Sequence, residues 1–421
     1  MVKFNFSTQL WTRIALINFC VTALAGVTLR YKINFPLPSI NQKYLLHSHS
    51  HFAFVGWVTL ALMALMVHYL VKNNLETNYK KYHIILAANC ITAYGMLITF
   101  LFQGYDVYSI TFSTLSIFVS YIFIYYYWLD LNKLKNVSHT NAWFKASLAI
   151  WAFSSLGAFS LAFLMANKIL IQDLYFSAIY FYLHFQYNGW FLFACFGLLF
   201  AWLYRSGIID SVVVSKPLFK IMAYTVVPTY LLSIIWLKLP TALHWIANIS
   251  AVLQLLVLFY FVKLFLVIKK DATLRLPGVT RLLWTMAAIA FVIKICLQLL
   301  SISPELSQYA FGYRPVIIGY LHLSFLGVIS FFILGFIEIL YKSMGSKLSK
   351  AGIYIFVSGV LLQEIILMVQ GLEAINVERL PYANIILLAS ACIMLLGLLL
   401  IALRTYKRVN VAAEKQQIKA G

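Results

Sequence analysis

Three short segments of the chain place a histidine in similar aromatic surroundings. They read HFAFVGW from His51, HFQYNGW from His184 and HLSFLGV from His322, each with a glycine five residues after the histidine. Neutral imidazole is a ligand for iron, copper and zinc, and glycine leaves room for a close neighbour, either a helix or a flat cofactor. The recurrence predicts a histidine site, with hydrogen bonding between helices as the simpler alternative.

Two more histidines, His47 and His49, precede His51 in the run HSHSH, and His244 lies elsewhere in the chain. Residues two apart on a helix point to different faces, whereas residues four apart share one. His47 and His51 can therefore act together, and His49 cannot bind the same centre as both. Because no thiolate cluster and no nearby carboxylate accompanies the histidines, the set favours haem over zinc.

The elements that position these residues are predicted to be membrane helices. Of the 421 residues, 63% are hydrophobic and only 10% are charged. This excludes the soluble-enzyme, disordered and disulfide-framework classes, because a soluble domain carries roughly 25% charged residues. A crossing helix needs about 20 apolar residues. Twelve stretches qualify, near 9–30, 44–71, 83–103, 107–130, 143–166, 174–204, 219–238, 244–268, 281–301, 314–341, 350–371 and 383–404.

The basic charge of the chain predicts its orientation. The formal net charge is +20, and 22 of the 32 Lys and Arg residues fall on the side that holds the N-terminus, the even-numbered loops and the C-terminal tail. Since cytoplasmic loops collect Lys and Arg, we expect both termini in the cytoplasm and the chain in the plasma (inner) membrane. The asymmetry accounts for the charge without nucleic acid, and leaves membrane lipid as the expected surroundings.

The twelve stretches group into three pseudo-repeated units of four helices, near 9–130, 143–268 and 281–404. The three histidine segments then fall in the second helix of each unit. The predicted fold is all-α, with residues 1–410 forming one polytopic transmembrane domain and 411–421 a basic cytoplasmic tail. At 1.5 Å per residue the histidines lie in the outer half of the bilayer, and His244 starts its helix at a similar level.

Two charged residues are expected near the middle of the bilayer, namely Lys294 and Glu364. An unpaired charge is costly there, and such residues are usually functional. The prediction is that they pair, or that they line a proton path with Gln298 and Gln363. A structural polar link between helices is the alternative.

These motifs resemble the haem-copper oxidase superfamily, whose catalytic subunit has twelve helices in three pseudo-symmetric quartets. The pattern HxHxxxxGW, typical of the tenth helix in the C-family cytochrome c oxidases, stands here from His49 to Trp57. The NnrS family is a second resemblance. The oxidase resemblance implies a low-spin haem b held by His51, or His47, together with His322, and a copper ligand at His184.

The chain also departs from the oxidase pattern. Tyr320 stands where the family has the histidine of its high-spin haem, and Thr241 and Ala242 stand near where helix 7 has two copper-binding histidines, so that only His244 remains there. The resemblance therefore implies an incomplete oxygen-reducing centre. Haem b is the expected cofactor, and copper is not expected to be retained.

The function that follows is electron transfer or redox sensing by a haem-binding membrane protein, with redox partner subunits. If the chain is an enzyme, the resemblance implies an oxidoreductase similar to cytochrome c oxidase or nitric oxide reductase. Two alternatives stay open: a transporter that handles protons or a metal ion, and a scaffold or assembly subunit with a vestigial haem site.

Overall fold

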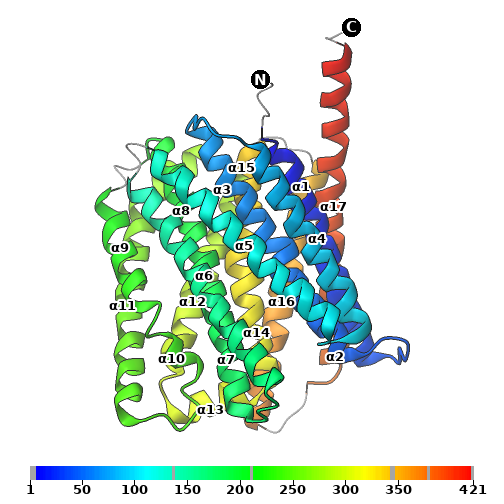
Figure 1. The fold of residues 1–421 in the computed structure, drawn as a ribbon, viewed down its shortest axis with the longest axis vertical. Coiled ribbons are helices and arrows are strands. Elements are labelled where there is room, and N and C mark those ends of the chain that lie inside the picture. The colour runs from blue at the N-terminus through cyan, green and yellow to red at the C-terminus, as the bar shows by residue number, and fades with distance from the viewer. Residues whose placement is uncertain (1–5, 135–137, 209–211, 342–346, 377–379, 419–421) are drawn as a thin grey trace.

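The computed structural model describes residues 6–134, 138–208, 212–341, 347–376 and 380–418, and in this part of the chain all regular structure is helical. The side chains of 404–421 lie outside the described residues, so the predicted basic tail at 411–421 is not characterised. Helix α1 begins and helix α17 leaves the bundle at the same end of the molecule (Figure 1), which we call the basic end. The opposite end is called the outer end.

Eleven helical stretches are long and apolar enough to cross a bilayer among the described residues. Three of them are composite. These are α2 (Gln42–Phe52), η1 (Ala53–Thr59) and α3 (Leu60–Lys72); α7 (Gln172–His184), η2 (Phe185–Phe191) and α8 (Leu192–Arg205); and α14 (Arg314–His322), η3 (Leu323–Ser330) and α15 (Phe331–Tyr341). The others are α1 (Thr8–Asn34), α4 (Lys80–Gln103), α5 (Val107–Lys133), α6 (Ser138–Ala166), α11 (Thr241–Arg275), α12 (Gly278–Leu300), α16 (Lys347–Asn376) and α17 (Ala383–Ile418).

The predicted seventh span, near 219–238, is not a continuous helix. It is divided into α9 (Val212–Thr225) and the single turn α10 (Tyr230–Ser233), with turns before and after α10. Pro228 lies in the first break, and a proline removes a backbone donor and clashes with the preceding turn of a helix. The described residues therefore contain eleven candidate spans where the sequence predicts twelve. Helix α13 (Pro304–Gly312) is a further short helix at the outer end.

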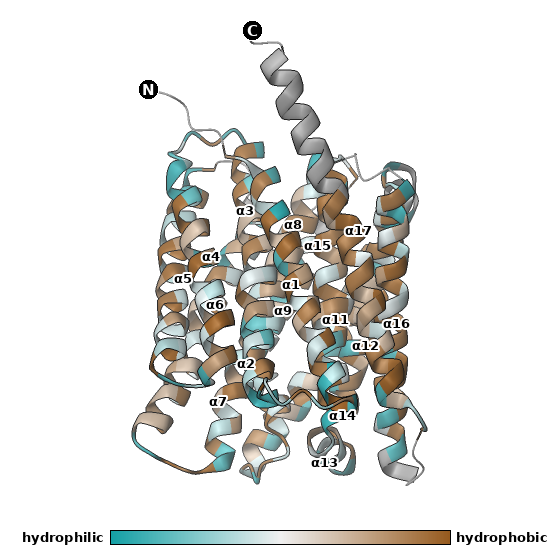
Figure 2. Ribbon diagram, turned by 90° about the vertical axis from the view of Figure 1, so that its right-hand side faces the viewer, coloured by the Kyte–Doolittle hydropathy of each residue, from teal (hydrophilic) through white to brown (hydrophobic). Residues whose placement is uncertain are grey.

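The three composite stretches form the centre of the molecule, and we call them the inner helices. Over a membrane-length window they are 83%, 78% and 72% buried within the protein, whereas the other eight spans are 17% to 50% buried. Figure 2 shows apolar residues along the outer spans. The helices that carry the recurring histidines are therefore enclosed by protein, and the remaining spans meet the lipid.

Each inner helix changes to a π-helical turn directly after its histidine segment begins. The π-helices η1, η2 and η3 start two residues after His51 and one residue after His184 and His322. Two of the inner helices also make the same aromatic contact, since Trp57 stacks on Phe19 at 4.2 Å and Trp190 stacks on Trp151 at 4.1 Å. Short π-helices occur frequently at functional sites, which directs attention to this level of the bundle.

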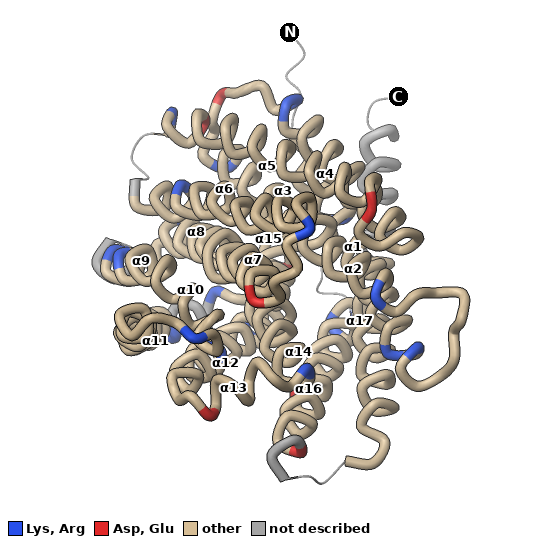
Figure 3. Tube along the Cα trace, turned by 60° about the horizontal axis from the view of Figure 1, so that its bottom comes forward, with Lys and Arg blue, Asp and Glu red and all other residues tan. Residues whose placement is uncertain are grey.

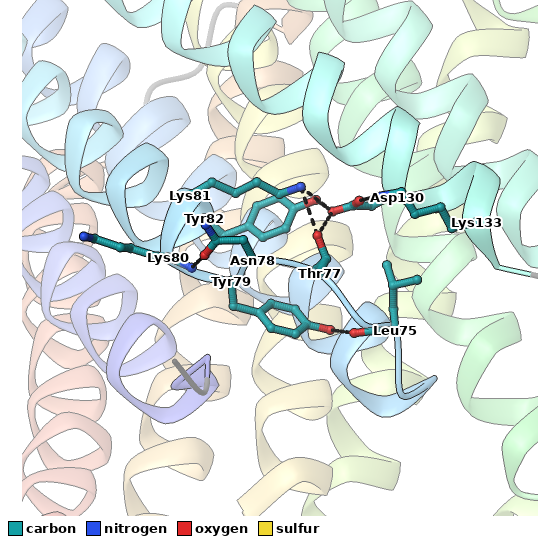
Figure 4. A network of polar contacts seen from close by, with 9 residues as sticks. All are labelled: Leu75, Thr77, Asn78, Tyr79, Lys80, Lys81, Tyr82, Asp130 and Lys133. Atoms are coloured by element: carbon teal, nitrogen blue, oxygen red, sulfur yellow. Dashed lines mark hydrogen bonds and ion pairs between the residues drawn. The ribbon is translucent and has the colours of Figure 1, made fainter. Parts of the chain in front are cut away.

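Charged residues gather at the helix ends and in the loops (Figure 3). At the basic end Asp130, fully buried, binds Lys81 at 2.7 Å and Lys133 at 2.6 Å. It also accepts hydrogen bonds from the hydroxyls of Tyr82 and Thr77 (Figure 4). This network joins α4, α5 and the loop before α4.

Candidate functional site

His49 lies on the face of α2 that packs against α1. Its Nδ1 is 3.0 Å from the carbonyl oxygen of Thr22. A carbonyl only accepts hydrogen bonds, so Nδ1 carries the proton and the lone pair is on Nε2. Gly26 lies one turn further along α1, and a Cβ atom there would be 3.4 Å from His49 Cε1. The ring of His49 is therefore fixed by α1, with its Nε2 left for another partner.

His322 has the same arrangement at the end of α14. Its Nδ1 is 2.8 Å from the carbonyl oxygen of Ile318, one turn earlier, so its Nε2 also carries the lone pair. Histidines that bind a metal almost always donate their other ring N–H to a carbonyl or carboxylate in this way. Two imidazoles from two inner helices are thus held in the tautomer that a metal needs.

His49 and His322 belong to one electrostatic group. The two histidines lie close enough to interact electrostatically, and Arg30 lies close enough to interact with both. Arg30 also interacts with Glu364 of α16 and with Arg314 at the start of α14. The structure thereby brings together α1, α2, α14 and α16 towards the outer end, with two histidines, two arginines and one carboxylate. No carboxylate or thiolate ligand cluster accompanies the histidines in the described part of the chain.

His47 and His51 lie on the other face of α2, so the predicted division of the HSHSH run is confirmed. The ring of His51 stacks on Phe100 at 4.3 Å, and its Nε2 is 3.0 Å from the hydroxyl of Tyr105. The ring of His47 meets the ring of Tyr105 edge-on at 4.7 Å. Burial raises the pKa of Tyr105 to about 12, which keeps its hydroxyl protonated. His47 and His51 therefore face α4 and the loop after it, and the expected pairing of one of them with His322 stays a prediction.

His184 is fully buried and both of its ring nitrogens have protein partners. Nε2 is 2.8 Å from the carbonyl oxygen of Val226, and Nδ1 is 3.0 Å from Nδ2 of Asn188. The break in the predicted seventh span is what presents Val226 to this imidazole. In this arrangement both ring nitrogens of His184 are engaged in hydrogen bonds, and the metal-ligand role expected for His184 and His244 stays a prediction. His244 lies in the first turn of α11 and makes no hydrogen bond to His184 in the described residues.

Lys294 lies beside His184 rather than beside Glu364. Its ammonium group donates to Oδ1 of Asn188 and, at 3.3 Å, to Oε1 of Gln298. It is also 5.9 Å from the ring centres of Tyr187 and Tyr320. The expected pair of Lys294 and Glu364 is corrected, because Lys294 binds the amides of Asn188 and Gln298 whereas Glu364 interacts with Arg30. The alternative, a proton path that includes Gln298 and Gln363, stays a prediction.

Asn188 joins these residues and was not singled out from the sequence. It lies in η2, four residues after His184, and contacts both His184 and Lys294. The available signal was its polarity at an apolar, central helix position. A cavity of about 30 Å³ adjoins Asn188, Lys294, Gln298, Thr225 and Thr229, which is room for one or two water molecules.

The two groups offer different chemistry. The His49–His322 group provides two neutral imidazole donors, and the His184–Lys294 group provides a cation, amides and phenols without a ligand set.

No protein-family model matches the chain, and no curated protein matches it in sequence.

Proposed function

We propose that the protein binds a low-spin haem b between His49 and His322 and serves in electron transfer or redox sensing. The observation that carries the proposal is the matched state of the two imidazoles, each with Nδ1 on a backbone carbonyl and Nε2 unclaimed. Bound there, the haem would supply one-electron redox chemistry. The enclosure of the inner helices supports it, because a low-dielectric shell around the iron is one of the levers on its potential.

The chain's own residues have separate tasks in this proposal. His49 and His322 would ligate, while Thr22 and Ile318 hold the rings in orientation through their carbonyl oxygens. Gly26 leaves the space beside His49 that a larger residue would fill. Arg30 and Arg314 supply positive charge towards the outer end, where the carboxylates of a haem would need partners.

The contacts of the His184–Lys294 group favour electron transfer over oxygen reduction. Tyr320 lies two residues before His322, with its ring 6.1 Å from that of Tyr187, next to Lys294. His184 is committed to Val226 and Asn188. The residues around His184 and Tyr320 are therefore engaged in hydrogen bonds and contacts with Lys294, and they offer no free ligand for an oxygen-reducing metal. This supports a redox carrier that passes its electrons to a partner subunit.

The orientation and the internal repeat belong to the same proposal. The recurrence of a π-helix after each histidine and the two Trp stacks support three related four-helix units, with the third span of the second unit reshaped as α9 and α10. The excess of Lys and Arg at the basic end supports a cytoplasmic position for both termini in a plasma membrane.

The test is the reduced-minus-oxidised absorption spectrum of protein purified from haem-replete cells. We expect a low-spin b-type spectrum with one haem per chain, and its loss in His49→Ala and in His322→Ala. His51→Ala is the matched control, since it removes an imidazole from the opposite face of the same helix and should keep the haem. A folded, haem-free preparation contradicts the proposal, as does a haem that survives His49→Ala but not His51→Ala.

A transporter of protons is the second candidate, and one observation favours it. Lys294 is buried, adjoins a small polar cavity and has neutral amide partners rather than a carboxylate. Proton-coupled uptake that is lost in Lys294→Met, in protein that carries no haem, would support this candidate against the first.

A further inference from the structure

Helix α2 carries a second pair of imidazoles, those of His47 and His51, on a different face from His49. Residues four apart on a helix lie side by side, and two histidines at this spacing form a chelate for a metal ion. The two rings lie close enough to interact electrostatically. Both also contact the ring of Tyr105, with ring centres 4.7 Å away for His47 and 5.9 Å away for His51. One phenol thus joins both imidazoles.

The Nε2 atoms of these two histidines are placed to bind a further partner. Nε2 of His47 is buried and has no hydrogen-bond partner among the described residues, and an unsatisfied buried polar atom is costly. Nε2 of His51 is 3.0 Å from the hydroxyl oxygen of Tyr105. Two ligands at about 2.0 Å from one metal ion and at a right angle to each other are about 2.9 Å apart. A metal ion can therefore replace the proton between His51 and Tyr105 with little movement of either side chain.

The short loop between α4 and α5 holds Tyr105 in this position. Gly104 turns the chain with a φ of +65°, a left-handed conformation that glycine adopts without strain. Asp106 then caps the first turn of α5 with its carboxylate. The ring of His51 is fixed in turn, because it stacks within 9° of parallel on the fully buried ring of Phe100. The phenol and the imidazole are therefore oriented before any ligand binds.

The group lies where an ion from outside the bundle can reach it. Helix α2 and the loop after α4 are both at the outer end of the molecule (Figure 1). The side chain of Tyr105 is 38% exposed, so water can complete the coordination of a bound ion from this side. Lys43, one turn before His47, lies close enough to interact electrostatically with it. This cation opposes metal binding, and its removal should not weaken the site.

We propose that His47, His51 and the phenolic oxygen of Tyr105 bind a divalent transition-metal ion, with Cu²⁺ bound most tightly. The affinity of nitrogen and oxygen ligands for divalent metals of the first row is highest for Cu²⁺. A right-angled arrangement also suits the tetragonal geometry of Cu²⁺ better than the tetrahedral geometry of Zn²⁺. When the phenolic oxygen binds the ion, its proton is released to water. The site is separate from the proposed haem site and does not depend on it.

The test is titration of the tag-free full chain in detergent with Cu²⁺, followed by calorimetry and electron paramagnetic resonance. We expect one Cu²⁺ per chain, with hyperfine splitting from two imidazole nitrogens. His47→Ala and His51→Ala should each weaken binding at least about 100-fold and Tyr105→Phe about ten-fold, since even residues that only orient a ligand contribute roughly 10- to 100-fold. Lys43→Gln is the matched control. It alters the same end of α2, keeps all three ligands and should bind Cu²⁺ at least as tightly.

A second variant separates the loss of a ligand from misfolding. His51→Gln keeps a hydrogen-bond acceptor for Tyr105 and lacks the imidazole, so it should retain the size-exclusion profile and helix content of the unaltered protein while losing Cu²⁺. Binding that is equal in the unaltered protein and in folded His47→Ala and His51→Gln shows adventitious copper only and overturns the proposal. So does a copper ion that is lost in His244→Ala but retained in His47→Ala, or Zn²⁺ that displaces Cu²⁺ at equal concentration.

Discussion

Asp130 is the residue on which the packing at the basic end depends. It is fully buried, while its partners Lys81 and Lys133 are 20% and 54% exposed. Asp130→Ala leaves Lys81, Tyr82 and Thr77 without their acceptor, so we expect the free energy of unfolding to fall by about 2–4 kcal/mol. Lys133→Ala is the control and should cost below about 1 kcal/mol, since its ammonium group is largely solvated. Denaturant titration in detergent measures both; equal effects would contradict the argument.

Residue spacing along the sequence predicted which histidines share a helix face. The partners of these residues depend on contacts between helices and could not be predicted from spacing. The two-residue offset in HSHSH correctly separated His49 from His47 and His51, because helical geometry is local. Which face meets His322 depends on how α2 packs against α1 and α4, and that information lies outside the motif. The same holds for Lys294. Its depth and its neighbour Gln298, four residues later on the same helix, were readable from the sequence, but its partner Asn188 depends on how η2 packs against α12.

A hydrogen bond from His184 stabilises the break in the predicted seventh span. Its Nε2 donates to the carbonyl of Val226, an acceptor that a continuous helix would have used internally. His184→Ala removes this donor and leaves a cavity, so we expect a loss of about 2–4 kcal/mol in the free energy of unfolding with the haem spectrum unchanged. His184→Gln keeps an N–H near the same place and should cost about half as much. Stoichiometric copper that disappears in both variants would show instead that His184 is a ligand.

Hydropathy predicted the other eleven spans because lipid imposes a length and an apolar composition on any crossing helix. The residues around 219–238 are equally apolar, so the same criterion could not detect the break. The detectable signal was Pro228 between Val226 and Tyr230, since proline interrupts a helix even in an apolar stretch. The broken backbone is tolerated because it is enclosed, with Val226 and Thr229 both buried.

At the scale of the whole molecule, three inner helices carry the histidines and eight spans enclose them. Eleven crossings alone would place the two ends of the bundle's chain on opposite sides of a membrane. Helix α1, however, begins at the same end at which α17 leaves the bundle (Figure 1). The segment of α9, α10 and the turns around them must therefore carry the chain across the bundle. The described backbone therefore passes between the two ends an even number of times, in eleven candidate spans and once through this segment.

This parity makes the orientation testable with one pair of substitutions. Ser39, in the loop between α1 and α2, and Glu76, in the loop between α3 and α4, are both exposed and lie at opposite ends of the bundle. Because Lys and Arg collect on the cytoplasmic side, a membrane-impermeant maleimide added to intact cells should label Ser39→Cys and leave Glu76→Cys unlabelled. Permeabilised cells should label both, and the unaltered protein gives the background from its own cysteines. Labelling of Glu76→Cys alone in intact cells would reverse the orientation and place the His49–His322 group near the cytoplasm.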